Sequence, residues 1–317
     1  MENNANRALA GVPWERAVIE KLLLAQVREQ RAARRWGLVR KLLLVLLLAL
    51  VAAALFAGRA SAPVRGPHTA VVEIKDEIAK GADASAEFVL PALRDAMEDK
   101  DAKALVLLIN SPGGSPVQAG IINDEIARLR KKHDKPVYAV VEDTCASGAY
   151  YIAAAADKIY VDKASLVGSI GVLMNGFGFV DTLDKLGVER RLLTAGQNKG
   201  FLDPFSPMTA EQKQFAQAML DQIHHQFITV VKKGRGERLK ETPEIFSGLF
   251  WTGEQAIDLG LADDYGSLGS VARDVIKAEK VVDYTHKANP MDRLAKRFGM
   301  ALGQGAVGAL RELPQVR

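Results

Sequence analysis

The chain has 317 residues, 48% hydrophobic and 25% charged, which is close to an ordinary globular protein and excludes low-complexity disorder or a collagen-like repeat. Its single cysteine, Cys145, excludes an internal disulfide framework and a multi-cysteine zinc site. Residues 1–41 hold nine of the 42 basic and four of the 38 acidic residues (net +5), which leaves 33 basic and 34 acidic residues in 42–317 (net −1). The nearly neutral bulk argues against nucleic acid as the main partner.

The first element in chain order is an apolar run, residues 42–58, with seventeen residues and no charge. At about 1.5 Å per residue a helix of this length just spans a bilayer, so we predict a transmembrane anchor. Two basic residues, Arg59 and Arg65, closely follow it, whereas six precede it. This asymmetry predicts a cytoplasmic N-terminus and places residues 59–317 across the membrane. The six are Arg28, Arg31, Arg34, Arg35, Arg40 and Lys41.

A cleaved signal peptide is the alternative for this run. Ala60-Ser61-Ala62 resembles a small-residue cleavage site, but Pro63 should impede cleavage and the basic region is unusually long. The run therefore favours an uncleaved anchor. The predicted segments are a cytosolic basic segment (1–41), containing a helix within 14–35, the anchor (42–58), a linker (59–68), one folded domain (69–285) and a C-terminal tail (286–317).

The folded domain alternates predicted strands and helices. The runs at 104–110 and 137–141 are continuously apolar, as in strands buried on both faces of a sheet. This rhythm predicts an α/β fold with a mainly parallel sheet. The expected strands are 70–75, 104–110, 137–141, 158–162 and 189–194, and the expected helices are 87–97, 117–129, 148–156 and 208–232, followed by a strand end and a capped helix at 251–256. Thr209 and Gln212 form a capping-box pattern at the start of the long helix.

Two loops after predicted strands could carry chemistry. Gly113-Gly114 follows the 104–110 strand, and glycines there can turn backbone N–H groups toward an anion. Ser147 lies at a strand-to-helix turn among small residues, which resembles the turn that presents a nucleophile, although a helix N-cap is the commoner use of such a serine. Gly148 follows it at the helix start.

Two further loops supply a serine and a lysine. Ser169 stands between glycines and could orient a base through a hydrogen bond. Lys199 follows the predicted 189–194 strand, where a solvated surface charge is the ordinary interpretation. Because these loops contain no histidine, a desolvated lysine is the base that could activate a serine.

Six motifs in order resemble the bacterial signal peptide peptidase A family in its short form, close to the SohB-like membrane proteases. The resemblance covers roughly residues 69–270 and leaves the first 58 residues and the tail outside. The motifs are Gly113-Gly114-Ser115, Ser147-Gly148 with Tyr150-Tyr151, Ala155-Ala156-Asp157-Lys158-Ile159, Gly168-Ser169-Ile170-Gly171, Lys199 and Gly253-Glu254-Gln255-Ala256.

The resemblance implies a fold related to Clp protease and crotonase, built from repeated ββα units. It implies a Ser/Lys dyad with Ser147 as nucleophile and Lys199 as general base. Ser169 matches the serine that orients the lysine, and Gly114 and Gly148 match the oxyanion donors. It also implies a homo-oligomer, an octamer with sites shared between subunits, and neither a cofactor nor a metal. Cys145 departs from the pattern and is interpreted as a small buried packing residue.

The sequence therefore predicts a membrane-anchored serine endopeptidase of the bacterial inner membrane, with its catalytic domain in the periplasm. Its substrates would be hydrophobic peptides such as remnant signal peptides. Two alternatives stay open: a crotonase-like acyl-CoA enzyme and a non-catalytic membrane scaffold. The location across the membrane and the presence of Ser147, Ser169 and Lys199 weigh against them.

Overall fold

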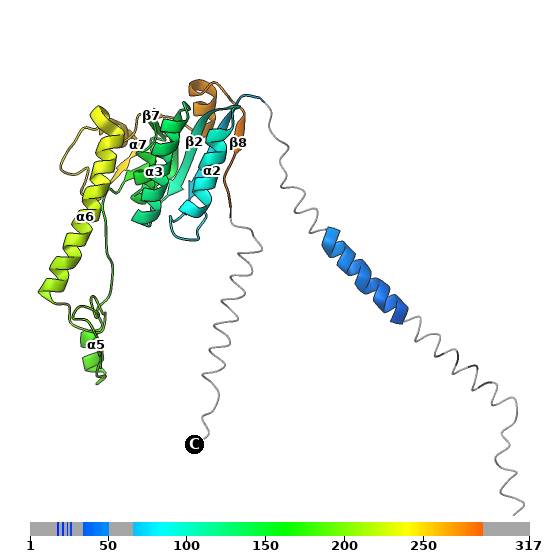
Figure 1. Cartoon of the computed structure of the whole chain (residues 1–317), viewed down its shortest axis with the longest axis horizontal. Coiled ribbons are helices and arrows are strands. Elements are labelled where there is room, and N and C mark those ends of the chain that lie inside the picture. The colour runs from blue at the N-terminus through cyan, green and yellow to red at the C-terminus, as the bar shows by residue number, and fades with distance from the viewer. Residues whose placement is uncertain are drawn as a thin grey trace, which may run out of the picture. The chain divides into compact units, whose positions relative to one another are not determined.

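The computed structural model describes residues 66–287, residues 34–50 and the single residues 18, 21, 24 and 26 (Figure 1). The chain divides into two compact units, Met1–Val64 and Arg65–Arg317.

In the first unit, residues 34–50 are helical, and the side chains from Leu42 to Leu50 are exposed. The remainder of the predicted anchor, residues 51–58, lies outside the described residues, as do most of the predicted cytosolic helix and residues 288–317 of the tail. Among the residues that are described, we find no helix both long and apolar enough to cross a membrane.

The second unit is built on a mixed sheet whose eight strands all lie within residues 66–287. Neighbouring strands pair in the order β6-β5-β3-β2-β1-β8, while β4 pairs with both β3 and β7. Every pairing is parallel except that between β5 and β6, as predicted for the sheet. The strands are β1 (His68–Lys75), β2 (Ala102–Ser111), β3 (Val137–Ala146), β4 (Lys158–Val161), β5 (Leu166–Gly168), β6 (Phe250–Thr252), β7 (Asp264–Tyr265) and β8 (Val281–Asp283).

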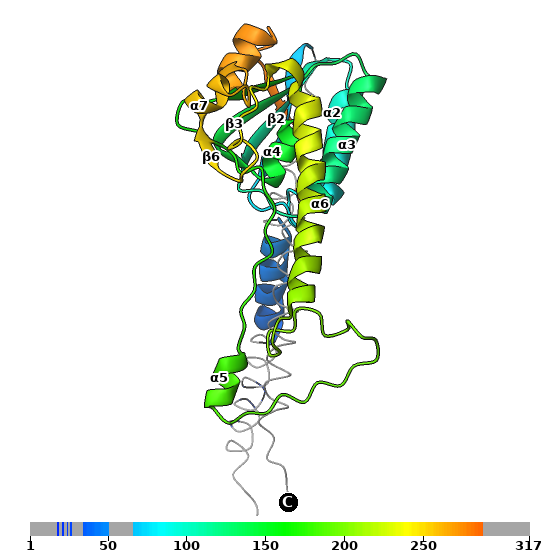
Figure 2. The ribbon, with the colours of Figure 1, turned by 90° about the vertical axis from the view of Figure 1, so that its left-hand side faces the viewer.

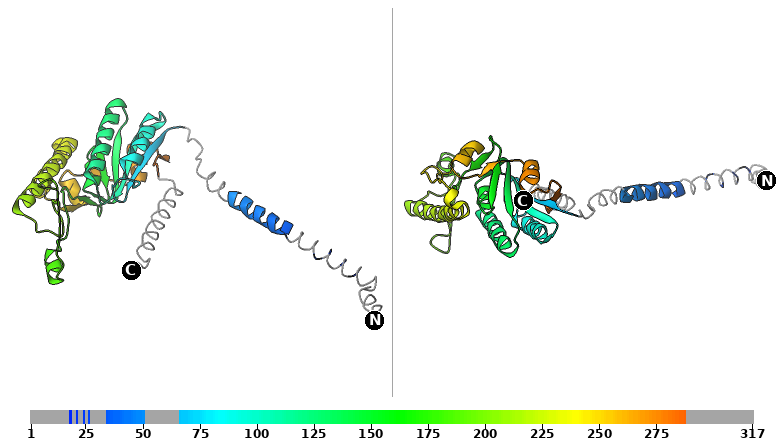
Figure 3. Two further views of the ribbon diagram at one scale, coloured as in Figure 1. Left: turned by 60° about the horizontal axis from the view of Figure 1, so that its bottom comes forward. Right: turned by 90° about the horizontal axis from the view of Figure 1, so that it is seen from above.

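The alternation of side chains along β2 divides the core into two layers. Leu105, Leu107 and Ile109 belong to the larger cluster, with the apolar stripes of α2 (Ala86–Glu98) and α3 (Pro116–Lys132). Val106 and Leu108 belong to a smaller cluster that includes Val271. Figure 3 accordingly shows helices on one face and the orange segment around residues 268–275 on the other. The prediction that 104–110 is buried on both faces is confirmed.

One long helix and several short helical segments follow β3 in the described part of the chain. The long helix α6 (Ala210–Arg235) begins at Thr209, whose hydroxyl accepts from the Gln212 N–H in the predicted capping box. Thr252 caps α7 (Gly253–Asp258) in the same way. The others are α4 (Gly148–Ala153), the single turn η1 (Gly236–Arg238), and α8 (Leu268–Ser270) with the π-helical turn η2 (Val271–Val275).

Residues 172–209, which we name the arm, leave the body of the domain. Figure 2 shows this stretch running beyond the sheet to the small helix α5 (Val180–Lys185), from where the chain returns through α6. Large apolar side chains of the arm are exposed, among them Leu173, Phe177 and Leu193. Within the single chain the arm therefore lacks the cover that its composition requires.

The predicted strand 189–194 is wrong. It lies on the arm, its residues are exposed, and none belongs to a strand of the described sheet. A strand needs a neighbour for its backbone groups, and the single chain offers none there. Other boundaries moved as well. For example, β3 continues to Ala146 because β5 pairs with its last three residues, and α4 ends at Ala153 rather than 156.

Candidate active site

Ser147 occupies a strained turn between β3 and α4. Its φ of 51° and ψ of −122° lie outside the regions that residues other than glycine usually adopt. Its N–H donates to the Gly168 carbonyl at 2.8 Å, and its carbonyl accepts from the Tyr151 N–H at 3.0 Å. Because both neighbours hold the turn, Ser147 is fixed at the end of a strand with a helix starting behind it.

The loop of Gly113 and Gly114 lies directly against this turn. Ile78 clamps the loop, since its N–H donates to Gly113 O at 2.8 Å and its carbonyl accepts from the Ser115 N–H at 2.7 Å. Both glycines have positive φ, and a β-carbon on Gly114 would lie 2.3 Å from the Ile78 oxygen. Only glycine fits this approach, because any side chain would collide with backbone.

The N–H groups of Gly114 and Gly148 lie beside Ser147 without an internal acceptor. A β-carbon on Gly148 would be 3.3 Å from the Gly114 nitrogen, which brings the two amides together. Within residues 66–287 neither of these N–H groups donates a hydrogen bond to another protein group. Two free amides next to a serine hydroxyl form the kind of pair that stabilises a developing oxyanion.

A cleft with a volume of about 630 Å³ opens at this point. Its polar wall contains Ser147, Gly114, Gly148 and Ser169, so four of the five predicted site residues line one cavity. Its apolar wall includes large side chains, most of them distant from Ser147 in sequence. These are Tyr151, Leu173, Ile223, Phe227 and Phe250.

Ser169 is held in a second turn of positive φ, 51°, at the end of β5. Its N–H donates to the Leu249 carbonyl at 2.8 Å, and its carbonyl accepts from the Gly171 N–H at 2.9 Å. The ring of His224 on α6 contacts the next carbonyl, Ile170 O, through Nε2 at 3.0 Å. The turn is therefore fixed from two sides at the point where the arm begins.

Lys199 does not reach this cleft within one chain. It is exposed on the arm, where its N–H donates to Gly196 O at 3.1 Å, and it is absent from the cleft wall. The structure thus brings together the predicted nucleophile, the oxyanion donors and the orienting serine. It leaves the predicted base outside.

Cys145 is fully buried on β3, two residues before Ser147, which confirms its interpretation as a packing residue. Burial raises the pKa of its thiol well above the ordinary range, which suppresses the thiolate.

The apolar wall from α6 and from residues 247–250 was not predicted from the sequence. Ile223 and Phe227 have the spacing of ordinary apolar positions of a long helix, and nothing in that spacing points to the cleft of Ser147, which precedes Ile223 by 76 positions. Only the packing of α6 beside α4 shows that these two side chains line the cleft. The same holds for Ser111, whose buried hydroxyl accepts from the Gly113 N–H at 3.1 Å and supports the glycine loop.

Residues 129–282 match the model of peptidase family S49. Among curated proteins, a sodium/proton antiporter NhaA of Brucella abortus is 49% identical over 181 residues, 57% of this chain but 25% of that protein. A candidate signal peptide peptidase SppA of Enterococcus faecium is 34% identical over 62% of this chain and 57% of its own length. This chain therefore spans between a quarter and somewhat more than half of these relatives.

A candidate protease of Methanocaldococcus jannaschii is 32% identical over 226 residues, which are 69% of this chain and 72% of that protein. A solved structure of a membrane-bound stomatin-specific protease aligns with a TM-score of 0.40 and 18% identity, over 68% of this chain and 84% of that one. The family model and the relatives named as proteases agree with the cleft around Ser147. This chain is a member of peptidase family S49.

Proposed function

We propose that this protein is a serine endopeptidase in which Ser147 is the nucleophile and Lys199 the general base. One observation carries the proposal: Ser147 stands in a strained turn at a cleft, beside the two unpaired N–H groups of Gly114 and Gly148. Membership of a peptidase family supports this chemistry over an acyl-CoA enzyme or a scaffold. The finer architecture proposed is the Clp protease and crotonase type, with repeated ββα units.

In the proposed reaction, neutral Lys199 takes the proton of the Ser147 hydroxyl, and the oxygen attacks the peptide carbonyl. The tetrahedral oxyanion lies between the N–H groups of Gly114 and Gly148. The lysine then gives its proton to the leaving amine. Water, activated by the same lysine, hydrolyses the acyl-enzyme and releases Ser147. Ser169 orients the lysine through a hydrogen bond.

The lysine is proposed to come from a neighbouring subunit. Lys199 is exposed outside its own cleft, and the arm that carries it exposes apolar side chains that a second copy would cover. A ring in which each arm reaches the next body is a heterologous assembly. The predicted octamer is one such ring.

The substrates proposed are hydrophobic peptides, including remnant signal peptides, because apolar side chains line the same cleft as Ser147 and the two amides. The protein is proposed to be anchored in the bacterial inner membrane by residues 42–58, with the catalytic domain in the periplasm, on the strength of the basic residues before that run. Protease added to spheroplasts should then digest the domain. Digestion only after the inner membrane is broken would show the opposite orientation, with the domain in the cytoplasm.

The test of the dyad is co-assembly of Ser147→Ala and Lys199→Ala chains, each inactive alone. In a random equal mixture about a quarter of the interfaces pair an intact serine with an intact lysine from the neighbour, so doubly tagged oligomers should recover peptide cleavage. If the dyad forms within one chain, no combination restores a site. Background activity in mixed oligomers that assemble normally would reject the shared site. A fluorophosphonate probe should label Ser147 in the wild-type protein.

A further inference from the structure

The arm returns to the body through α6, a long helix that is fully buried at few positions. Of the 26 residues of α6, only Phe227, Val231 and Arg235 are buried, and they form one stripe at i, i+4 and i+8. At about 1.5 Å per residue, the stripe covers roughly 13 Å of a helix about 39 Å long. The N-terminal part of α6 extends beyond the body toward α5 (Figure 2).

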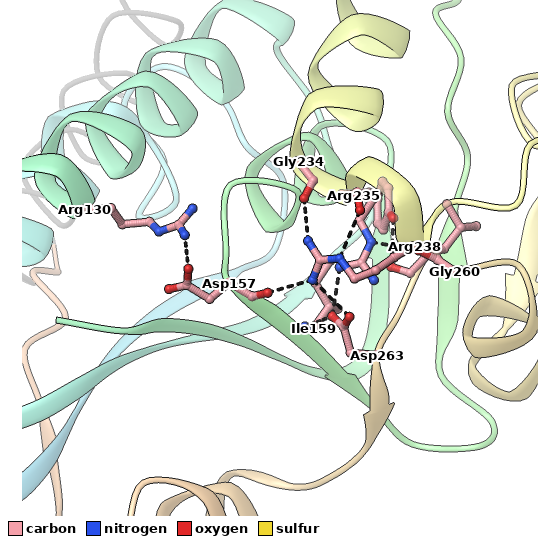
Figure 4. A network of polar contacts seen from close by, with 10 residues as sticks. Arg130, Asp157, Ile159, Gly234, Arg235, Arg238, Gly260 and Asp263 are labelled. Carbon is pink, nitrogen blue, oxygen red and sulfur yellow. Dashed lines mark hydrogen bonds and ion pairs between the residues drawn. The ribbon is translucent and has the colours of Figure 1, made fainter. Parts of the chain in front are cut away.

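Arg235 is the last residue of this stripe and is 1% exposed. Its Nε donates to the Gly260 carbonyl at 2.8 Å, and its Nη1 donates to Asp263 Oδ2 at 2.8 Å (Figure 4). Asp263 is itself fixed, because Oδ2 also accepts from the Ile159 N–H of β4 at 2.7 Å. A planar guanidinium with partners in two directions prevents rotation of the helix about its own axis.

Arg238 adds a second tie from the surface. It donates to Asp263 Oδ1 at 3.0 Å, to Asp157 O at 2.7 Å and to Gly234 O at 2.6 Å. Gly234 allows the close approach, because a β-carbon there would lie 1.9 Å from the Ala154 oxygen at the end of α4. The end of α6 is thus fixed to α4, β4 and the loop before β7.

The nucleophile has its own, independent supports. Ser147 is held by Gly168 of β5 and by the pairing of Cys145 on β3 with Ser111 on β2, and the glycine loop is held by Ile78. A small rotation of α6 at its anchored end would leave these contacts in place. The rotation would move Ile223 and Phe227 in the wall of the same chain's cleft, and His224 beside Ile170, less than it moves the arm, because these residues lie nearer to the anchored end. It would be magnified at the far end, where α6 continues into the arm that bears Lys199.

We propose that Arg235 is a positioning residue for catalysis, acting through α6 and the arm on the lysine delivered to the neighbouring subunit. The inference rests on the proposed Ser147/Lys199 site shared between subunits. General stabilisation would affect both chains equally, whereas this inference expects the effect of Arg235 to be larger in the chain that donates the lysine than in the chain that donates the serine.

The experiment uses mixed oligomers of full-length chains, one carrying Lys199→Ala (the serine donor) and one carrying Ser147→Ala (the lysine donor). Arg235→Lys is introduced into one chain or the other. Lysine keeps the positive charge but lacks the planar guanidinium that bonds both Gly260 and Asp263. On the lysine donor it should lower kcat by about tenfold or more with little change in KM. On the serine donor it should lower kcat by about twofold or less.

Arg128→Lys is the matched control, since the guanidinium of Arg128 also donates to a carboxylate, that of Glu125, but on α3 and away from α6. The kcat of the mixed oligomer should be the same whichever chain carries Arg128→Lys. If Arg235→Lys chains do not assemble, Arg238→Gln removes the outer tie and leaves the buried pair, and should show the same chain dependence at smaller size.

If Arg235→Lys lowers kcat equally on both chains, or only on the serine donor, the inference is overturned, provided that the parental mixture without this substitution is active. An inactive parental mixture would instead overturn the shared site, and this inference with it.

Discussion

Gly113 packs so closely on Ser147 that a β-carbon built on the glycine would lie 2.7 Å from the Ser147 Cβ and 2.8 Å from the Gly148 nitrogen. No real β-carbon tolerates such distances to backbone, and the φ of 100° adds strain for any other residue. Gly113 therefore sets how close the glycine loop and the nucleophile turn can come.

Gly113→Ala should consequently push apart the two proposed oxyanion donors and lower kcat/KM by about 100-fold. The matched control is Gly120→Ala on α3, where a β-carbon meets nothing within 4 Å. That variant should keep activity within about twofold and gain slightly in stability, because alanine favours helix. Wild-type kcat/KM in Gly113→Ala would show that the loop does not serve catalysis.

Lys199→Arg should be folded and inactive. Arginine keeps the positive charge but cannot lose its proton at working pH, so it cannot accept the serine proton. Wild-type activity should rise from acid to alkaline pH, because the lysine must lose its own proton before it can accept that of the serine. Lys185→Arg, also exposed on the arm, is the control that should leave the pH profile unchanged. Substantial cleavage by Lys199→Arg would exclude lysine as the base.

Cys145 should be chemically silent in the native protein. It is fully buried and burial raises the pKa of its thiol, so neither access nor thiolate is available. Maleimide at about pH 8 should label it only after unfolding, and native enzyme treated with the reagent should keep its activity. Rapid native labelling with loss of cleavage would mean that β3 opens beside Ser147.

Glu125 should contribute pH-dependent stability. Hydrogen bonds from Arg128, and from Arg94 at 2.6 Å, lower its pKa from the ordinary 4.5 to about 2. A carboxyl with a depressed folded-state pKa stabilises the protein above its unfolded pKa and loses that contribution as the pH falls from about 4.5 toward 2. Because both arginines are half exposed, we expect about 1–2 kcal/mol.

Glu125→Gln should accordingly lower the free energy of unfolding in urea at about pH 7, and the difference from wild type should shrink toward about pH 3. Glu98→Gln, whose exposed partner is Lys132, is the control and should change little. A difference for Glu125→Gln that stays constant with pH would locate its effect in packing and not in charge.

Local patterns in the sequence were sufficient for most of the sheet and for the two capping boxes. The runs that form β2 and β3 can be recognised because strands buried on both faces are continuously apolar. The caps at Thr209 and Thr252 can be recognised because they involve residues close together in the chain. The resemblance, not periodicity, singled out Ser147, Ser169 and the glycines. Their meeting at one cleft agrees with the rule that strand ends meet at one edge of a parallel sheet.

The tertiary structure alone decided what depends on contacts between distant segments. It turned 189–194 from a predicted strand into part of an exposed arm, because a strand requires a paired neighbour that one chain does not supply. It also placed α6 along the cleft and fixed the end of that helix through Arg235 and Asp263, residues 28 positions apart. No sequence pattern marks these two charged residues as a pair. Folding removes them from water, and each charge then needs the other as its partner.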